Sequence, residues 1–181
     1  MWLLYSKGSK SSLISFADAR CLSDPHKARS QSRYIFTYGD TAIWWHPQKQ
    51  TIVATSSNHV EILALHEASR EGVWLRSLVH HIRETCGLSF DQRSPTILYE
   101  DNTIRIAQVE WGYIKGDRTK HISPKFFCTH ALQKKGDIDI QQICANNNLA
   151  DLVTKALPTS TFEKLVQKIG IRHLKDLLLM T

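Results

Sequence analysis

Four acidic residues far apart in the sequence have the types that phosphodiester chemistry uses. Asp18 lies in an apolar run, Glu61 near the start of a long amphipathic stretch, Asp101 after a short β-type run and Asp151 in a late helical stretch. Like charges gathered in one site favour protonation unless a cation neutralises them. Two Mg²⁺ ions about 3.5–4 Å apart can align a water for attack and stabilise the departing oxygen. If folding brings the four acids together, they predict a Mg²⁺ site, with Mn²⁺ as the alternative metal.

Each of these acids also has an explanation that involves no chemistry. Asp18 can be a polar residue on an exposed strand face, although Asp is a poor strand former. Glu61 follows Asn58 at the spacing of a capping box. Asp101 can form the turn or cap that begins a helix, and Asp151 can complement a helix dipole. Spacing alone therefore leaves both explanations open for every one of them.

The elements that must position these acids begin with three predicted strands. Residues 13–19, 33–38 and 41–45 are rich in β-branched and aromatic residues, which favour extended structure. Gly39-Asp40 separates the second run from the third, and such a pair is a hairpin signal. We therefore expect an antiparallel three-stranded meander.

A long amphipathic helix is the strongest periodic signal in the chain. Apolar residues recur every three or four positions over residues 58–84, which is the period of a helix with one buried face. A short strand at 96–99 ends in Glu100-Asp101-Asn102 and leads into a helical stretch that reaches Val109.

The last elements complete a mixed α/β pattern. Residues 123–135 predict a helix that begins at a proline and ends before a glycine, and residues 138–144 predict a fifth strand. Residues 149–157 and 161–179 predict two further helices. The resulting order, β-β-β-α-β-α-α-β-α-α, predicts a mixed sheet with helices crossing over between its strands.

Length and composition predict one domain in a reducing compartment. The chain has 181 residues, 42% of them hydrophobic, which suffices for one core. We assign residues 13–158 to the domain, residues 1–12 to a disordered lead or linker remnant, and residues 159–181 to a C-terminal helical tail. The four cysteines have no paired spacing, and no run approaches the roughly 20 apolar residues of a membrane span. We expect a soluble, intracellular protein with no membrane partner.

A basic loop with nearby aromatic residues is a candidate nucleic-acid contact. Lys115, Arg118 and Lys120 follow closely after Trp111 and Tyr113, and the formal net charge is +6. Lysine and arginine bind phosphates, and an aromatic ring can stack on a base or sugar. A solvated charged loop explains the same composition.

A second basic group lies between the first two predicted strands. It includes Lys27 and Arg29, which we expect to contact the opposite strand of a duplex.

Four stretches of the chain closely resemble one protein family. They are residues 51–57 followed by Glu61, then residues 99–102, 119–122 and 149–158. Together they resemble the C-terminal ribonuclease H domain of Pol polyproteins from copia-type plant LTR retrotransposons, in the order and spacing of that family. The resemblance covers about residues 13–170. It implies a ribonuclease H-like mixed five-stranded sheet with helices on both faces, and Mg²⁺-dependent hydrolysis of the RNA strand of RNA–DNA hybrids.

The resemblance also assigns roles to individual residues. The family's four metal-binding acids fall on Asp18, Glu61, Asp101 and Asp151, so every position retains an acid. Where the family has small residues, this chain has Arg20 near the first acid and Arg105 near the third. We expect these arginines to place positive charge beside the metal site and to weaken metal binding.

Three functional hypotheses follow. The leading one is a ribonuclease H domain that hydrolyses hybrid RNA by two-metal catalysis and works beside a reverse transcriptase domain of the same polyprotein. The second is a catalytically silent, truncated fragment that keeps the fold and binds nucleic acid without cutting it. The third is a structural fragment that binds a partner domain. No motif of a polymerase, protease or integrase is found in this sequence.

Overall fold

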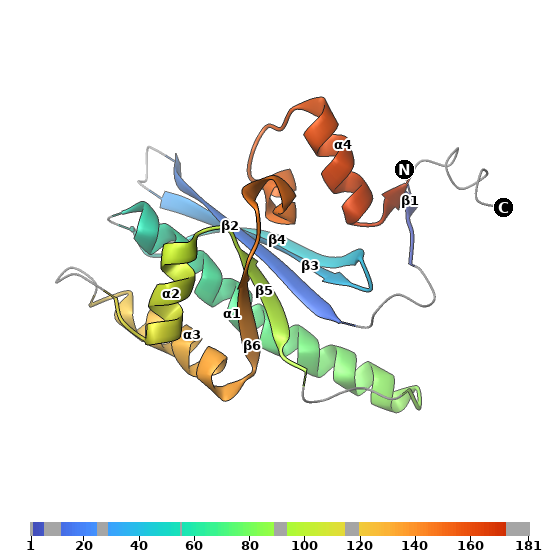
Figure 1. The fold of residues 1–181 in the computed structure, drawn as a ribbon, viewed down its shortest axis with the longest axis horizontal. Coiled ribbons are helices and arrows are strands. Elements are labelled where there is room, and N and C mark those ends of the chain that lie inside the picture. Colours follow the sequence, from blue (N-terminus) through green and yellow to red (C-terminus); the bar gives the residue numbers. More distant parts are fainter. Residues whose placement is uncertain are drawn as a thin grey trace.

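The computed structural model describes residues 2–5, 12–24, 29–54, 56–88, 94–114 and 120–172. A central sheet and its flanking helices account for most of them (Figure 1). The strands are β1 (Trp2–Leu3), β2 (Leu13–Asp24), β3 (Arg29–Tyr38), β4 (Thr41–Lys49), β5 (Thr96–Glu100), β6 (Ile138–Gln142) and β7 (Ile171–Arg172). The helices are α1 (Ser57–Thr85), α2 (Thr103–Trp111), α3 (Ser123–Lys135) and α4 (Thr159–Lys168), with the short 3₁₀ turns η2 (Ala145–Asn147) and η3 (Leu149–Val153).

The central sheet has five strands in the order β4-β3-β2-β5-β6. β3 pairs antiparallel with both β2 and β4, whereas β5 pairs parallel with both β2 and β6. The predicted hairpin between β3 and β4 is confirmed, and its turn residues Gly39 and Asp40 have φ values of 59° and 60°. Two successive positive φ values match the right-handed twist of the flanking strands.

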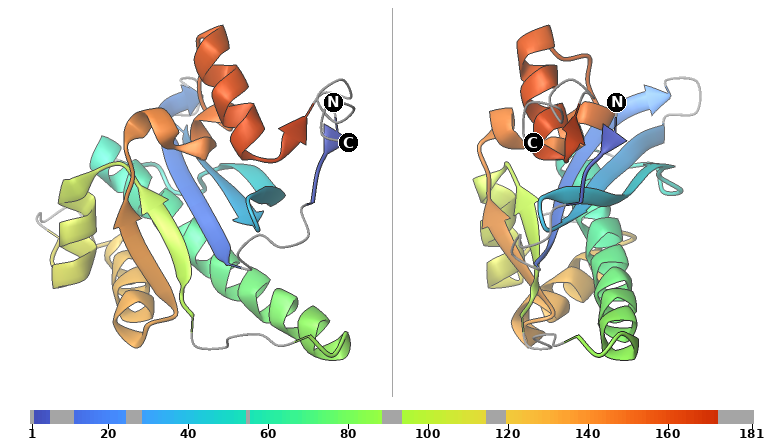
Figure 2. Two further views of the ribbon diagram at one scale, coloured as in Figure 1. Left: turned by 45° about the vertical axis from the view of Figure 1, so that its right-hand side comes forward. Right: turned by 90° about the vertical axis from the view of Figure 1, so that its right-hand side faces the viewer.

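Helices cover both faces of this sheet (Figure 2). On one face, α1 and α3 pack against the strands around a core that contains Phe36, Leu65 and Phe126. On the other face, η3 and α4 enclose a second cluster that contains Phe16 and Leu165. The predicted fold class, a mixed five-stranded sheet with helices on both faces, is therefore confirmed.

Helix α1 confirms the long amphipathic helix but corrects its cap. Its N-cap is Ser56, whose side chain accepts a hydrogen bond from the backbone N–H of His59 at 3.3 Å. Asn58 lies inside the helix. The capping-box explanation for Glu61 was therefore wrong, because the helix begins two residues earlier and Ser56 already caps it.

The C-terminal elements differ in detail from the predicted helices. Residues 149–157 form the short 3₁₀ turn η3 over Leu149–Val153 instead of a longer helix. The predicted helix at 161–179 is α4, which ends at Lys168 and is followed by β7. Gly170 ends this helix with a φ of 82°, a conformation that glycine adopts at little cost. Residues 173–179 lie outside the described part of the chain.

The two ends of the described chain pair with each other. β1 and β7 form a two-stranded antiparallel sheet in which Trp2 faces Arg172 and Leu3 faces Ile171. Trp2 and Leu3 belong to the predicted disordered lead, of which Met1 and residues 6–11 lie outside the described residues. The division at residues 12 and 158 stays a prediction.

Helix α4 contributes to the core despite following the predicted domain boundary. Leu165 is fully buried, whereas Glu163 on the same helix is exposed. We expect Leu165→Ala to lower the free energy of unfolding by about 2–5 kcal/mol, because it leaves a cavity beneath α4. Glu163→Ala is the matched control and should change it by less than about 0.5 kcal/mol. Urea unfolding tests this, and equal stabilities would show that α4 is a dispensable tail.

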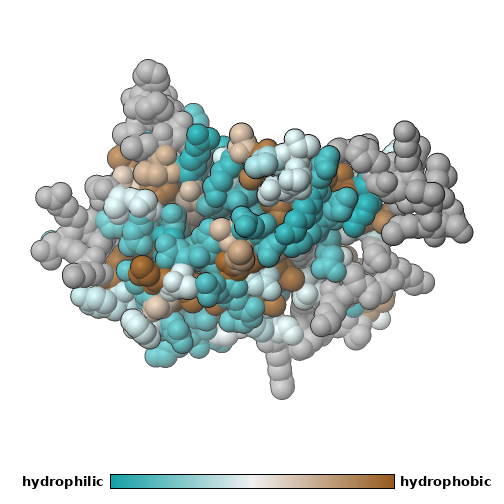
Figure 3. Space-filling model, turned by 45° about the horizontal axis from the view of Figure 1, so that its top comes forward, coloured by the Kyte–Doolittle hydropathy of each residue, from teal (hydrophilic) through white to brown (hydrophobic). Residues whose placement is uncertain are grey.

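The surface is mixed in character. On the face shown in Figure 3, hydrophobic residues are scattered among hydrophilic ones.

Of the helices that the structure describes, none is both long and apolar enough to cross a bilayer.

Candidate functional site

The sheet register brings the first and third predicted acids to the same level. Phe16 of β2 faces Tyr99 of β5 in the parallel pair. Continuing this register by two residues places Asp18 level with Asp101, just beyond the end of β5. Glu100, the last residue of β5, is buried beside them. Two strands that run in the same direction therefore deliver three carboxyl groups to one region.

Helix caps do not use the predicted acids. The side chain of Asn102 caps α2, accepting from the backbone N–H of Ile104 at 3.0 Å and of Arg105 at 3.4 Å. The cap explanation for Asp101 was therefore wrong, because the neighbouring residue performs that role. Asp18 is not on an exposed strand face either, because its side chain is only 11% exposed.

Asn148 positions the fourth acid, and sequence reasoning missed it. Its fully buried side chain donates a hydrogen bond to the Ala17 carbonyl at 3.0 Å and accepts one from the Ala150 N–H at 3.1 Å. These bonds hold η3 against β2 next to Asp18, which brings Asp151 to the same region. An asparagine just before a helical turn is a capping signal that could have been used.

Lys155 links Asp151 to Asp18. Its Nζ lies 2.8 Å from Asp151 Oδ1 and 3.6 Å from Asp18 Oδ2. Burial lowers the pKa of Lys155, but the hydrogen bond that Lys155 donates to Asp151 and the charges of Asp18, Asp151 and Asp101 together raise it. Lys155 therefore joins Asp151 to Asp18, and the register of β2 and β5 places Asp101 level with Asp18.

Arg105 occupies the other side of this group. Its side chain is only 3% exposed, and Nε donates to Glu100 Oε1 at 3.1 Å while Nη2 pairs with Glu61 Oε2. The sequence predicted a cation here, and the structure confirms it for Arg105. Arg20, the other arginine expected to be near the metal ligands, is exposed on β2. We call Asp18, Glu61, Glu100, Asp101, Asp151, Arg105 and Lys155 the acidic site.

Burial raises the pKa of two acids in this site, Asp18 and Glu100. It raises the pKa of Asp18, and Lys155 offsets part of that effect. Burial, followed by the charge of Asp101, raises the pKa of Glu100 to about 8. The hydrogen bond from the Asn102 N–H to Glu100 acts in the opposite direction, and the guanidinium of Arg105 lies 3.1 Å from the same Glu100 oxygen. The ionised site therefore depends on positive charge close to its carboxyl groups.

The three aspartates have the donor chemistry of a Mg²⁺ site. Asp18 Oδ2 is buried without a hydrogen-bond partner, and oxygen ligands from carboxylates are those that Mg²⁺ prefers. Within the described residues, however, no three His, Cys, Asp or Glu side chains are already gathered as a metal-binding group. Arg105 and Lys155 hold several of the acids instead. Asp18, Asp101 and Asp151 thus have the ligand type of a divalent cation but are not gathered as ligands among the described residues, and Arg105 engages Glu61.

The predicted nucleic-acid contacts are only partly described. Lys115, Arg118 and Lys27 lie outside the described residues, whereas Lys120 and Arg29 are exposed. The aromatic residues before the loop project into solvent at the end of α2: Trp111 is 77% exposed and Tyr113 is 65% exposed.

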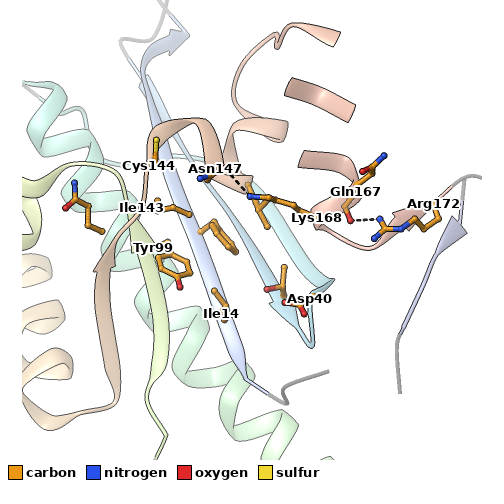
Figure 4. A pocket seen from close by; sticks show the side chains of 13 residues that line it. Ile14, Asp40, Tyr99, Ile143, Cys144, Asn147, Gln167, Lys168 and Arg172 are labelled. Atoms are coloured by element: carbon orange, nitrogen blue, oxygen red, sulfur yellow. Dashed lines mark hydrogen bonds between the residues drawn. The ribbon is translucent and has the colours of Figure 1, made fainter. Parts of the chain in front are cut away.

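A separate pocket of about 590 Å³ lies between the sheet and α4 (Figure 4). Ile14, Tyr99 and Ile143 line one part of it, and Lys168 and Arg172 line another. None of the residues that line it belongs to the acidic site, so it is not the place of the predicted chemistry.

Comparison with known proteins supports a retroelement relationship. No family model matches the chain. A retrovirus-related Pol polyprotein from transposon TNT 1-94 of Nicotiana tabacum is 27% identical over 164 residues, which is 91% of this chain and 12% of that protein. The Pol polyprotein from transposon RE1 of Arabidopsis thaliana is 26% identical over 169 residues, which is 93% of this chain and 11% of that protein. The chain thus spans about a tenth of the length of these relatives.

Solved structures identify the fold. The N-terminal ribonuclease H domain of a Mycobacterium tuberculosis protein, studied as a fusion with maltose-binding protein, has a TM-score of 0.54 and 14% identity. The match covers 87% of this chain and 98% of that one. The fold is therefore ribonuclease H-like, and the resemblance predicted from the sequence is confirmed.

Proposed function

We propose that this chain, a relative of retrotransposon Pol polyproteins with a ribonuclease H-like fold, hydrolyses the RNA strand of RNA–DNA hybrids with Mg²⁺. Mn²⁺ is the alternative metal. One observation carries the proposal: the parallel register of β2 and β5 and the Lys155 bridge bring Asp18, Asp101 and Asp151 to one region. Carboxylate oxygens gathered in this way are the ligands that Mg²⁺ prefers.

The aspartates would hold the metal, and the remaining residues would organise the site. Asp18, Asp101 and Asp151 would be ligands, with Glu61 as the predicted fourth. When bound, Mg²⁺ supplies an activated water and stabilises the departing oxygen. Asn148 keeps Asp151 beside β2 through its hydrogen bond to Ala17. The position of the acids is thus fixed by the backbone of two parallel strands and one short turn.

Lys155 is suited to meet the scissile phosphate. Its side chain is 49% exposed, so its ammonium group can turn from Asp18 and Asp151 toward a nucleic-acid backbone. A phosphate would compensate the positive charge that the aspartates now compensate. In this proposal Lys155 orients the substrate, while the aspartates hold the metal.

Helix α2 connects the acidic site with an exposed aromatic surface. It begins at Thr103, directly after the acids, and ends at Trp111, about 12 Å further along its axis. Tyr113, two residues beyond the end of α2, is exposed as well, and so is Lys120 after the loop. An RNA–DNA hybrid lying over Asp101 would reach these side chains, which would recognise the shape and 2′-hydroxyl groups of the duplex without reading its sequence.

Trp111→Ala tests the contribution of this surface to binding. We expect the Kd for a hybrid to rise about fivefold or more, because stacking on an aromatic ring contributes about 1–3 kcal/mol. Trp74→Ala is the matched control, because Trp74 is also exposed but lies far along α1. Fluorescence anisotropy in the presence of a chelator measures binding without cleavage. An equal Kd for both variants would remove α2 from the interface.

The relatives imply a setting for this activity. Because the chain corresponds to a small part of much longer Pol polyproteins, we propose that a reverse transcriptase domain of the same polyprotein is its partner and supplies the hybrid. Lys115, Arg118, Lys120, Lys27 and Arg29 remain the proposed phosphate contacts.

The test of the proposed function is cleavage of a hybrid by the purified chain. A labelled RNA annealed to DNA is incubated with Mg²⁺ and, separately, with EDTA, beside an RNA duplex and a DNA duplex of the same sequence. We expect cleavage of the hybrid alone and only with metal. A folded protein that leaves the hybrid intact at every metal concentration would refute the proposal.

A further inference from the structure

Arg105 is an unusual residue for the interior of an acidic site. Its guanidinium is almost fully buried, contacts both Glu61 and Glu100, and lies within the electrostatic influence of Asp18. A buried charge is tolerated only when it is paired and hydrogen-bonded. These contacts place one permanent positive charge among three carboxyl groups, which is where a metal ion would otherwise neutralise them.

The backbone fixes Arg105 in this position. It lies in the first turn of α2, and its N–H bonds to both the carbonyl and the side chain of Asn102. Glu100 Oε1, which Arg105 contacts, also accepts a hydrogen bond from the Asn102 N–H at 3.3 Å. Hydrogen bonds thus link Glu100, Asn102 and Arg105 at the start of α2, and Arg105 supplies the positive charge of this group.

The two cations of the acidic site differ in how easily they can leave it. Lys155 is half exposed and can move its ammonium group into water at little cost. Arg105 cannot do so, because its departure would leave Glu100 buried and unpaired. A metal that approaches the three aspartates would therefore displace Lys155, while Arg105 would stay with Glu61.

We propose that Arg105 is a built-in cation that withholds Glu61 from divalent metal, so that the chain folds without metal and binds it weakly through the aspartates alone. The proposal rests on the proposed function in assuming that the acidic site takes a divalent cation. It makes Arg105, with Glu100, the determinant of metal affinity. The guanidinium of Arg105 therefore supplies part of the positive charge that a second metal ion would bring.

The experiment measures binding of Mg²⁺ and Mn²⁺ by calorimetry, without nucleic acid. The informative variant is Arg105→Met combined with Glu100→Met, because it removes the buried pair together and leaves Glu61 free. We expect it to bind metal about tenfold or more tightly than the wild type, since a positive charge close to the metal has been removed. Adding Glu61→Gln to this variant should abolish the gain.

Two further variants separate charge from packing. Arg105→Lys keeps the positive charge and should bind metal about as weakly as the wild type. Arg76→Met is the matched control, because it breaks another arginine–carboxylate pair, with Asp137, at a different place. Its metal affinity should equal that of the wild type.

The outcomes can be distinguished from those of the cleavage assay. Metal affinities that are equal in the wild type and in the double variant would overturn the role of Arg105. A double variant that folds neither without metal nor with it would also overturn the inference. A wild-type chain that binds metal weakly but cuts no hybrid would refute the proposed function and leave this inference standing.

Discussion

Arg105→Met alone is expected to lower the free energy of unfolding by about 3–5 kcal/mol in metal-free buffer. The reason is that Glu100, with a side chain only 5% exposed, and Glu61 would lose the guanidinium that compensates them. Part of the loss should be relieved by protonation, because burial and Asp101 already raise the pKa of Glu100 to about 8. Urea unfolding at pH 7 measures the effect.

Two comparisons identify the source of this loss. The double variant Arg105→Met with Glu100→Met should recover much of the stability, because replacing both buried partners by apolar groups leaves no uncompensated carboxyl at position 100. Arg76→Met should cost less, since the partner Asp137 has a side chain that is 19% exposed and can be hydrated. If Arg105→Met costs no more than Arg76→Met, the buried pair does not stabilise the fold as its contacts suggest.

Asp101→Asn is expected to reduce hybrid cleavage about 100-fold or more, because it removes the charge of a proposed metal ligand at the end of β5. The same change should not destabilise the fold, since the charge of Asp101 raises the pKa of its buried neighbour Glu100. Single-turnover cleavage with Mg²⁺ and urea unfolding are measured on the same preparation.

Glu110→Gln provides the matched control for that substitution. Glu110 is an exposed acid on α2, the helix that follows Asp101, and its replacement removes the same charge. We expect cleavage within about twofold of the wild type, because the effect of a distant exposed charge is screened. Cleavage that falls equally in both variants would assign the loss to net charge and not to the acidic site.

Much of the fold was predictable because its signals are local. The Gly39-Asp40 turn, the apolar period of α1 and the proline and glycine that bound α3 each act within a few residues. The pairing of β1 with β7 was not predictable, because two residues at one end of the described chain meet two at the other. Such short strands have no pattern of their own.

The candidate site, too, was predictable from the sequence only in part. Asp18, Glu61, Asp101 and Asp151 were found through resemblance, and the charge of Arg105 was found as a departure from it. Their catalytic role stays a prediction that the variants above test.

Three contributing residues were missed because their partners are distant in sequence. Lys155 follows Asp151 by four residues and thus reads as an ordinary helical pair, yet it also reaches Asp18. Asn148 acts through Ala17, a residue of the first long strand. Glu100 was missed because its role is to pair with a buried Arg105, and the sequence does not show that Arg105 is buried.

The most direct test of the account is a single-turnover reaction on one hybrid that carries different labels on its RNA and DNA strands. Wild-type protein and Asp101→Asn are compared in Mg²⁺, after both have been shown to be folded. The account predicts that the wild type shortens only the RNA strand and that the variant leaves both strands intact over the same time. An uncut RNA strand with the wild type, or equal cutting by both proteins, would contradict it.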